Sequence, residues 1–231
     1  YKAGWNLAEE FVNMYIGHGG EFFEAGSAKP SINNAKGVAT LNMLKKLADL
    51  SNPDYLTHDS EAIKVEWEAG NVAIMTLWAS RSGTLLDDEG DAKITAATKL
   101  VAPATVGGGN IPAATLWWDG FTLAKNRPDA DAEASFRAMA HAASSKEMVA
   151  KASDQAVWLV EGFVPGPKSV GVIEAVKMGA KPYPMLPQMG LMHGALGNEI
   201  VEFLQGNETA EQALKDVEAA YNTKAKEQGF L

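Results

Sequence analysis

The chain has no cysteine, and this absence excludes disulfide frameworks, cysteine-based zinc sites and thiol nucleophiles. It also lacks the run of about 18 apolar residues that a membrane-spanning helix needs. Basic residues are scarce, with 20 Lys and Arg against 29 Asp and Glu and a net charge of −9. Nucleic acid and anionic membranes are therefore poor partners. The remaining composition, 231 residues of which 46% are hydrophobic, is that of a globular protein.

Most catalytic and metal-binding signatures are missing too. There is no G-x-S-x-G elbow, no H-E-x-x-H pair and no phosphate-binding G-x-x-x-x-G-K-[ST] loop. The histidines, at positions 18, 58, 141 and 193, have no metal-ligand spacing. The acidic run 87–91 lacks the alternating ligands of a calcium loop and is interpreted as a solvated turn. We therefore expect neither a metal nor a cofactor.

Apolar periodicity predicts an α/β fold in which helices outnumber strands. Asn33 or Asn34, Asp59 or Ser60, and Thr209 are predicted to begin helices, with Gln212 completing a capping box at Thr209. The predicted helices cover 6–16, 34–51, 60–69, 131–143, 146–153, 170–179, 189–205 and the stretch after 209, and the predicted strands cover 21–24, 72–77, 94–102 and 115–124. The run 72–77 is continuously apolar, as in a strand covered on both faces.

The six tryptophans are the most conspicuous feature. Trp78 follows the apolar run 72–77, and Trp117 and Trp118 come just before Asp119. In an open α/β sheet, ligands bind beyond the carboxyl ends of the strands, where indole rings can stack on the C–H face of a sugar. The alternative is that each tryptophan is a core residue. Trp67 and Trp158, which lie within or beside helical stretches, are expected to be ordinary packing residues.

Four segments, in order along the chain, carry a family resemblance. They are EAGNVAIMTLW at 68–78, WDGFTLAKN at 118–126 with the helix at 132–143, YPMLPQM at 183–189, and GNETAEQAL at 206–214. Together they resemble the extracellular solute-binding proteins of carbohydrate ABC importers, the family of maltose-binding protein. The resemblance runs over nearly the whole chain.

The resemblance implies a periplasmic-binding-protein-like fold of type II, with two α/β lobes joined by crossover strands. Residues 1–118 and 183–231 would form the second lobe, and 119–182 the returning part of the first. Most of the first lobe would then be missing. We expect a missing N-terminal segment, a second chain or a symmetry copy to pack against 119–182, or else an irregular lobe there. Because the chain starts at Tyr1, a secretory signal is expected to be absent or already removed.

Site residues follow by position in the motifs. Trp78 matches the family's sugar-stacking aromatic, and Trp117, Trp118 and Asp119 match the position between the lobes. His193 stands where maltose-binding protein has an aromatic pair, and this departure favours a smaller ligand. Two further candidates are Arg81, whose guanidinium can bind vicinal hydroxyls or a carboxylate or pair with a neighbouring acid, and Trp5 at the start of the first helix.

The resulting hypothesis is a periplasmic, non-enzymatic component of an ABC importer. It would hold a sugar or polyol between two lobes that close by a hinge, and would deliver it to a membrane permease. One alternative is a carbohydrate-active enzyme with a carboxylate pair drawn from Asp119, Glu9 or Glu161. Another is an interaction module whose exposed tryptophans bind a protein.

Overall fold

A computed structural model describes residues 1–87 and 90–231 of the chain. The backbone contacts divide it into two compact units. Unit 1 comprises Tyr1–Ile63, Pro103–Leu116 and Ala175–Leu231, and unit 2 comprises Lys64–Ala102 and Trp117–Glu174. The middle of the predicted acidic turn at 87–91 lies outside the described residues.

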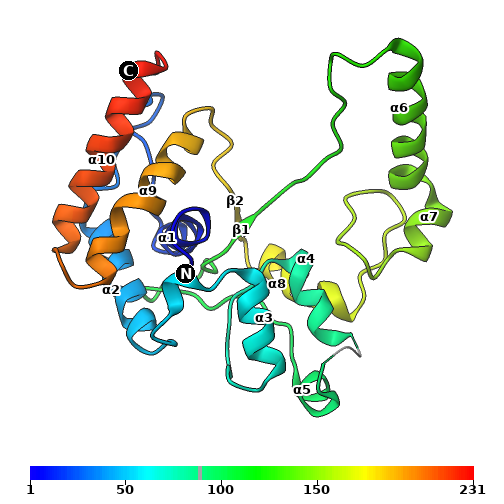
Figure 1. Cartoon of the computed structure of the whole chain (residues 1–231), viewed down its shortest axis with the longest axis horizontal. Coiled ribbons are helices and arrows are strands. Elements are labelled where there is room, and N and C mark those ends of the chain that lie inside the picture. Colours follow the sequence, from blue (N-terminus) through cyan, green and yellow to red (C-terminus); the bar gives the residue numbers. More distant parts are fainter. Residues whose placement is uncertain (88–89) are drawn as a thin grey trace. The chain divides into compact units, whose positions relative to one another are not determined.

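Four helices build the core of unit 1: α1 (Trp5–Gly17), α2 (Ala35–Asp49), α9 (Met189–Leu204) and α10 (Ala210–Glu227). Helix α9 packs against both α10 and α1, and α2 packs against α1 and α10 (Figure 1). Each helix contributes an apolar face, and the fully buried side chains include Leu7, Phe11, Tyr15, Leu41, Leu44, Met192, Leu196, Ile200, Leu214 and Tyr221. Removing these faces from water is the main source of stability for unit 1.

The helix caps of unit 1 follow from single side chains. The Asn34 carboxamide oxygen accepts from the Lys36 and Gly37 amides at 2.8 and 3.1 Å, which begins α2 as predicted. The Thr209 hydroxyl accepts from the Gln212 amide at 3.2 Å and begins α10. The second half of the predicted capping box is wrong, because the Gln212 side chain donates to Asp216 at 2.7 Å.

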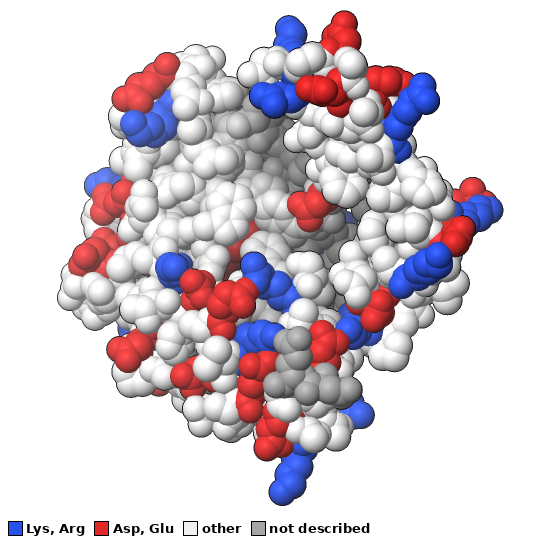
Figure 2. Space-filling view, turned by 45° about the vertical axis from the view of Figure 1, so that its right-hand side comes forward, with Lys and Arg blue, Asp and Glu red and all other residues white. Residues whose placement is uncertain are grey.

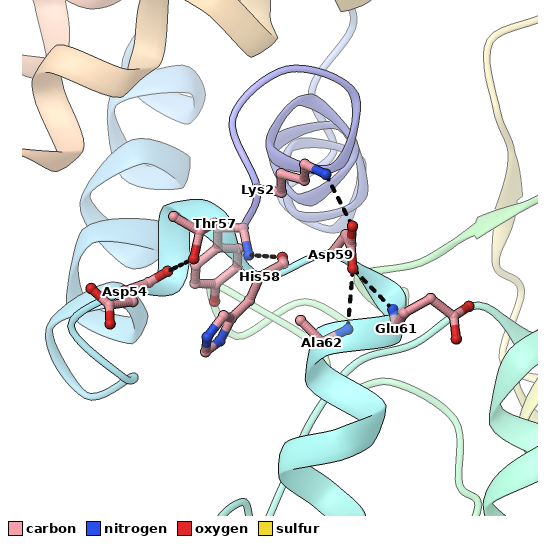
Figure 3. A network of polar contacts seen from close by, with 8 residues as sticks. Lys2, Asp54, Thr57, His58, Asp59, Glu61 and Ala62 are labelled. Atoms are coloured by element: carbon pink, nitrogen blue, oxygen red, sulfur yellow. Dashed lines mark hydrogen bonds and ion pairs between the residues drawn. The ribbon is translucent and has the colours of Figure 1, made fainter.

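Helix α3 (Ser60–Glu68) begins at Asp59. One oxygen of the Asp59 carboxylate accepts from the Glu61 and Ala62 amides, each at 3.1 Å, and the other lies 3.0 Å from the Lys2 ammonium (Figure 3). Asp59 therefore caps a helix and also fastens the first residues of the chain.

The sheet is much smaller than predicted. β1 (Thr115–Leu116) pairs in parallel with β2 (Lys181–Pro182), with Thr115 opposite Lys181. The predicted strand 115–124 is right only for its first two residues, and the predicted strand 21–24 is reduced to a single bridge from Phe23 to Pro30.

Unit 2 holds most of α3, together with α4 (Ala79–Ser82), α5 (Ala92–Ala97), α6 (Asp129–Ser144), α7 (Lys146–Lys151) and most of α8 (Val170–Lys177). The last three lie where helices were predicted. The strands predicted at 72–77 and 94–102 are wrong: the first is irregular, with Ile74 91% exposed, and the second is helical up to the end of α5 and irregular over 98–102. A β-prone segment becomes a strand only beside a partner, and the described residues of unit 2 include no strand.

The segment 119–182 exposes apolar side chains. Helix α6 buries none of its residues, Phe136 on it is 60% exposed, and Phe121 before it is 65% exposed. This agrees with the incomplete lobe expected from the sequence. Over the described ranges, no helix has both the length and the apolar character needed to cross a membrane.

The two compact units differ from the two predicted lobes in three segments: besides 64–102, residues 117–118 lie in unit 2 and residues 175–182 lie in unit 1. Residues 64–102, predicted to lie in the second lobe, contact 117–174 and belong to unit 2. The lobes were inferred from a longer family member, whereas the units reflect contacts within this chain alone. The lobe assignment stays a prediction.

Candidate ligand-binding site

Two tryptophans of unit 2 pack against each other. Trp78 precedes α4, and its carbonyl accepts from the Arg81 and Ser82 amides at 2.9 and 2.8 Å. Trp117 directly follows β1. Their rings meet edge to face, with centroids 5.7 Å apart and an interplanar angle of 77°, and both side chains are half-buried. This arrangement is a favoured geometry for aromatic pairs, so each indole holds the other in place.

Trp118 is the exposed member of this group. It is 66% exposed, and its ring lies against Gly120, where an added Cβ would come within 3.0 Å of the indole. Asp119, next to it, is exposed, as is Arg81 on α4. The structure thus places five of the seven predicted site residues in unit 2. Neither Trp78 nor Trp118 is buried, and their contact with a ligand stays a prediction.

Trp67 and Trp158 are packing residues, as expected. The Trp67 indole donates to the Thr98 hydroxyl at 3.1 Å, and the Trp158 indole donates to the Ala152 carbonyl at 2.8 Å. Both are half-buried, with the indole N–H bonded within unit 2.

Trp5 and His193, the other two predicted site residues, form a cluster in unit 1. The rings stack with centroids 3.8 Å apart and an interplanar angle of 27°. Trp5 is 53% exposed, whereas His193 is only 1% exposed. The structure therefore differs from the prediction that His193 itself contacts a ligand. It lies beneath Trp5, and the indole is the surface of the pair.

The hydrogen bonds of His193 indicate the tautomer and the protonation state of its imidazole. Its Nε2 lies 3.0 Å from the Trp5 carbonyl oxygen, and its Nδ1 lies 3.0 Å from the Tyr183 hydroxyl. A carbonyl oxygen can only accept, so Nε2 carries the hydrogen, and in the neutral ring Nδ1 accepts from Tyr183. Burial lowers the pKa of His193, and the bond to the Trp5 carbonyl opposes this more weakly. The imidazole is therefore neutral when the pH is above the ordinary histidine pKa of 6.5.

Tyr183 and Glu9 extend the cluster into the interior. Burial raises the pKa of the Tyr183 phenol, and the nearby Glu9 carboxylate raises it further. Glu9 is 4% exposed and accepts a hydrogen bond of 2.5 Å from the hydroxyl of Thr115 in β1. The Tyr183 amide in turn donates to the Leu116 carbonyl at 3.0 Å. The cluster thus joins α1, α9, β1 and the residue that follows β2.

Sequence reasoning missed this arrangement, although a signal was present. Gly197 stands one helical turn after His193, inside α9, where glycine is destabilising unless another backbone comes close. In the structure the Gly4 amide donates to the Gly197 carbonyl at 3.0 Å. The conspicuous glycine marks the place where α1 begins against α9.

The described residues do not assemble a metal site. Across 1–87 and 90–231 there is no group of three His, Asp or Glu side chains able to hold a metal ion. Glu161 pairs with Lys146 at 3.1 Å on the surface of unit 2, while Glu9 is buried in unit 1. On the face shown in Figure 2, Lys and Arg alternate with Asp and Glu.

No family model and no curated protein matches the chain, but solved structures do. Maltose-bound MalE3 from T. maritima is 19% identical, with 92% of this chain and 56% of that one covered and a TM-score of 0.71. An ABC transporter solute-binding protein from Agrobacterium radiobacter K84, in complex with ribitol, is 17% identical (96% and 57% covered, TM-score 0.70). The maltose/maltodextrin-binding domain MalE from Bdellovibrio bacteriovorus, bound to maltotriose, is 13% identical (97% and 60% covered, TM-score 0.72).

This chain has the fold of type II periplasmic-binding proteins. The predicted fold class is therefore confirmed. The chain spans 56–60% of the length of these three proteins. At this level of identity the likeness establishes the fold, and the ligand must be argued separately.

Proposed function

We propose that the chain is the substrate-binding component of an ABC importer, or part of one, and that it binds a sugar or polyol without chemical change. The observation that carries this proposal is the likeness in fold to proteins holding maltose, ribitol and maltotriose. The exposed indoles of Trp5 and Trp118 support it, because exposed aromatic faces suit the C–H surface of a carbohydrate.

The candidate site residues of unit 2 have different roles in binding, which follow from the chemistry of their side chains. Trp118 offers the exposed stacking face. The packing of Trp117 against Trp78 holds the residue that directly precedes Trp118 in place. The Asp119 carboxylate accepts hydrogen bonds from ligand hydroxyls, and the Arg81 guanidinium donates to their oxygens. We place this binding in a cleft between two lobes that close on the ligand by a hinge.

The proposal includes two partners and a location. A membrane permease receives the ligand, and the protein works in the periplasm. A further polypeptide packs against 119–182, which supplies cover for Phe121 and Phe136.

Isothermal titration calorimetry with ribitol, maltose and maltotriose tests the proposal, followed by chromatography of each ligand after incubation. We expect saturable binding of at least one ligand and its recovery unchanged. Trp118→Ala should weaken binding about tenfold, the effect of losing one aromatic contact, whereas Trp158→Phe serves as the matched control and should not. A new product would favour the carbohydrate-active enzyme instead, and the absence of binding would contradict the proposal.

A further inference from the structure

We propose that His193 is a positioning residue that holds the Trp5 indole as an aromatic face for a sugar ring or polyol on unit 1. This inference rests on the proposed function and adds a second stacking surface to it. His193 touches no ligand in this scheme. It acts through Trp5, which is 53% exposed above it.

The backbone before Trp5 is fastened along its whole length. The Lys2 and Ala3 amides donate to the His58 and Leu56 carbonyls at 3.1 and 3.0 Å. The Lys2 ammonium pairs with Asp59, as Figure 3 shows. Gly4 then adopts a φ of 93°, in the left-handed region that favours glycine, and turns the chain into α1. These contacts therefore fix the backbone position of Trp5, the first residue of α1.

The close approach of α9 to the backbone of Gly4 fixes the position of Trp5 relative to α9. At Gly197 an added Cβ would lie 2.3 Å from the Gly4 carbonyl oxygen and 2.6 Å from its carbon. Only glycine permits this contact between two backbones. Because His193 precedes Gly197 by one turn, the same face of α9 brings the imidazole under the indole.

The imidazole holds Trp5 in two ways. Its ring stacks on the indole at 3.8 Å, and its Nε2–H donates to the Trp5 carbonyl at 3.0 Å. Its Nδ1 accepts from Tyr183, whose own backbone is hydrogen-bonded to β1. The position of Trp5 is thus fixed by α9 and by the paired strands together.

This degree of fastening is more than an incidental surface tryptophan requires. Single exposed apolar side chains are ordinary and need no support. Here a buried histidine stacks on one exposed indole, and both of its ring nitrogens are held by hydrogen bonds, one of them to the backbone of the same tryptophan. A rigid aromatic face loses little conformational entropy when a ligand stacks on it, which is the benefit of preorganisation in a binding site.

The test uses the full chain labelled with 5-fluorotryptophan, with each ¹⁹F resonance assigned by single Trp→Phe variants. Ribitol, maltose and maltotriose are titrated in separate experiments, and calorimetry gives the affinity. We expect the Trp5 resonance to shift with ligand and Trp5→Ala to weaken binding about tenfold. His193→Ala should move the Trp5 resonance without ligand and weaken binding similarly. His193→Phe, which keeps an aromatic ring under the indole, should restore part of the affinity.

The outcomes separate this inference from the proposed function. If ligand binds and shifts the Trp118 resonance but not that of Trp5, the inference is overturned and the proposed function stands. A loss of thermal stability in both His193 variants with unchanged affinity would give His193 a purely structural role and would also overturn it. Should His193→Ala fail to fold, Tyr183→Phe removes one hydrogen bond to the imidazole and should move the Trp5 resonance. If none of ribitol, maltose and maltotriose binds, both proposals fail.

Discussion

At the scale of single residues, His193 links the stability of unit 1 to pH. Burial holds its pKa below the ordinary value of 6.5, so the folded chain resists a proton that the unfolded chain accepts. Its contribution is complete above pH 6.5 and is lost as the pH falls below that value. Urea unfolding between pH 8 and pH 5 should therefore show a smaller decrease in His193→Phe than in the wild type. His18, whose pKa burial also lowers, contributes equally to both proteins. Equal decreases would contradict the assignment.

A second residue-scale prediction concerns two glycines of α9. Gly197→Ala should destabilise the protein by about 1–3 kcal/mol, because the new methyl group meets the Gly4 backbone, which cannot move aside as a side chain can. Gly194→Ala is the matched control, since an added Cβ there meets nothing within 4 Å. Gly194→Ala should raise the free energy of unfolding by about 0.5–1 kcal/mol, because alanine favours an exposed helix position more than glycine does. Chemical denaturation of both variants measures the difference, and equal stabilities would disprove the close approach.

At the scale of elements, Thr209 determines where α10 begins. Thr209→Ala should lower the free energy of unfolding by about 0.5–2 kcal/mol, because the Gln212 amide loses its partner. Thr209→Ser, which keeps the hydroxyl, should stay near the wild type. Gln212→Ala tests the missing half of the capping box and should cost less, since that side chain reaches Asp216 on the helix surface. Ligand affinity should not change in any of the three, and a tenfold loss would place α10 at the site.

The same elements show why some structure was predictable and some was not. Helix starts at Asn34, Asp59 and Thr209 depend on one side chain and the next few amides, so the local sequence contains the whole signal. The run 72–77 was predicted to be a strand from its apolar character alone. A strand also needs a neighbour, and the described part of unit 2 offers none.

The candidate site divides in a similar way. Trp78 and Trp117 were named from their positions at the ends of predicted strands, and they meet in the structure. The burial of His193 under Trp5 was not foreseen, because it joins residues 188 positions apart. Periodicity within one helix indicates which face is buried, but it does not identify the residue from another helix that covers that face.

At the scale of the whole molecule, the two units differ in how much apolar surface they bury. In unit 1, α1 and α9 have continuous buried faces that include Phe11 and Leu196. In unit 2, α6 has no buried residue and exposes Phe136. Backbone amides open more readily where few apolar contacts hold a segment, so the local free energy of opening should differ between the units.

Hydrogen exchange followed by mass spectrometry measures that difference directly. We expect peptides from α1 and α9 to be protected for much longer than peptides from α6, because opening α6 exposes no additional apolar core. Phe136→Gln should leave global stability within about 0.5 kcal/mol of the wild type, as for other surface positions, whereas Phe11→Ala should cost about 3–5 kcal/mol. Equal protection of α6 and α9 in the chain alone would mean that α6 is already covered. Protection of α6 that rises only when a further polypeptide is added would instead identify 119–182 as the surface that the polypeptide occupies.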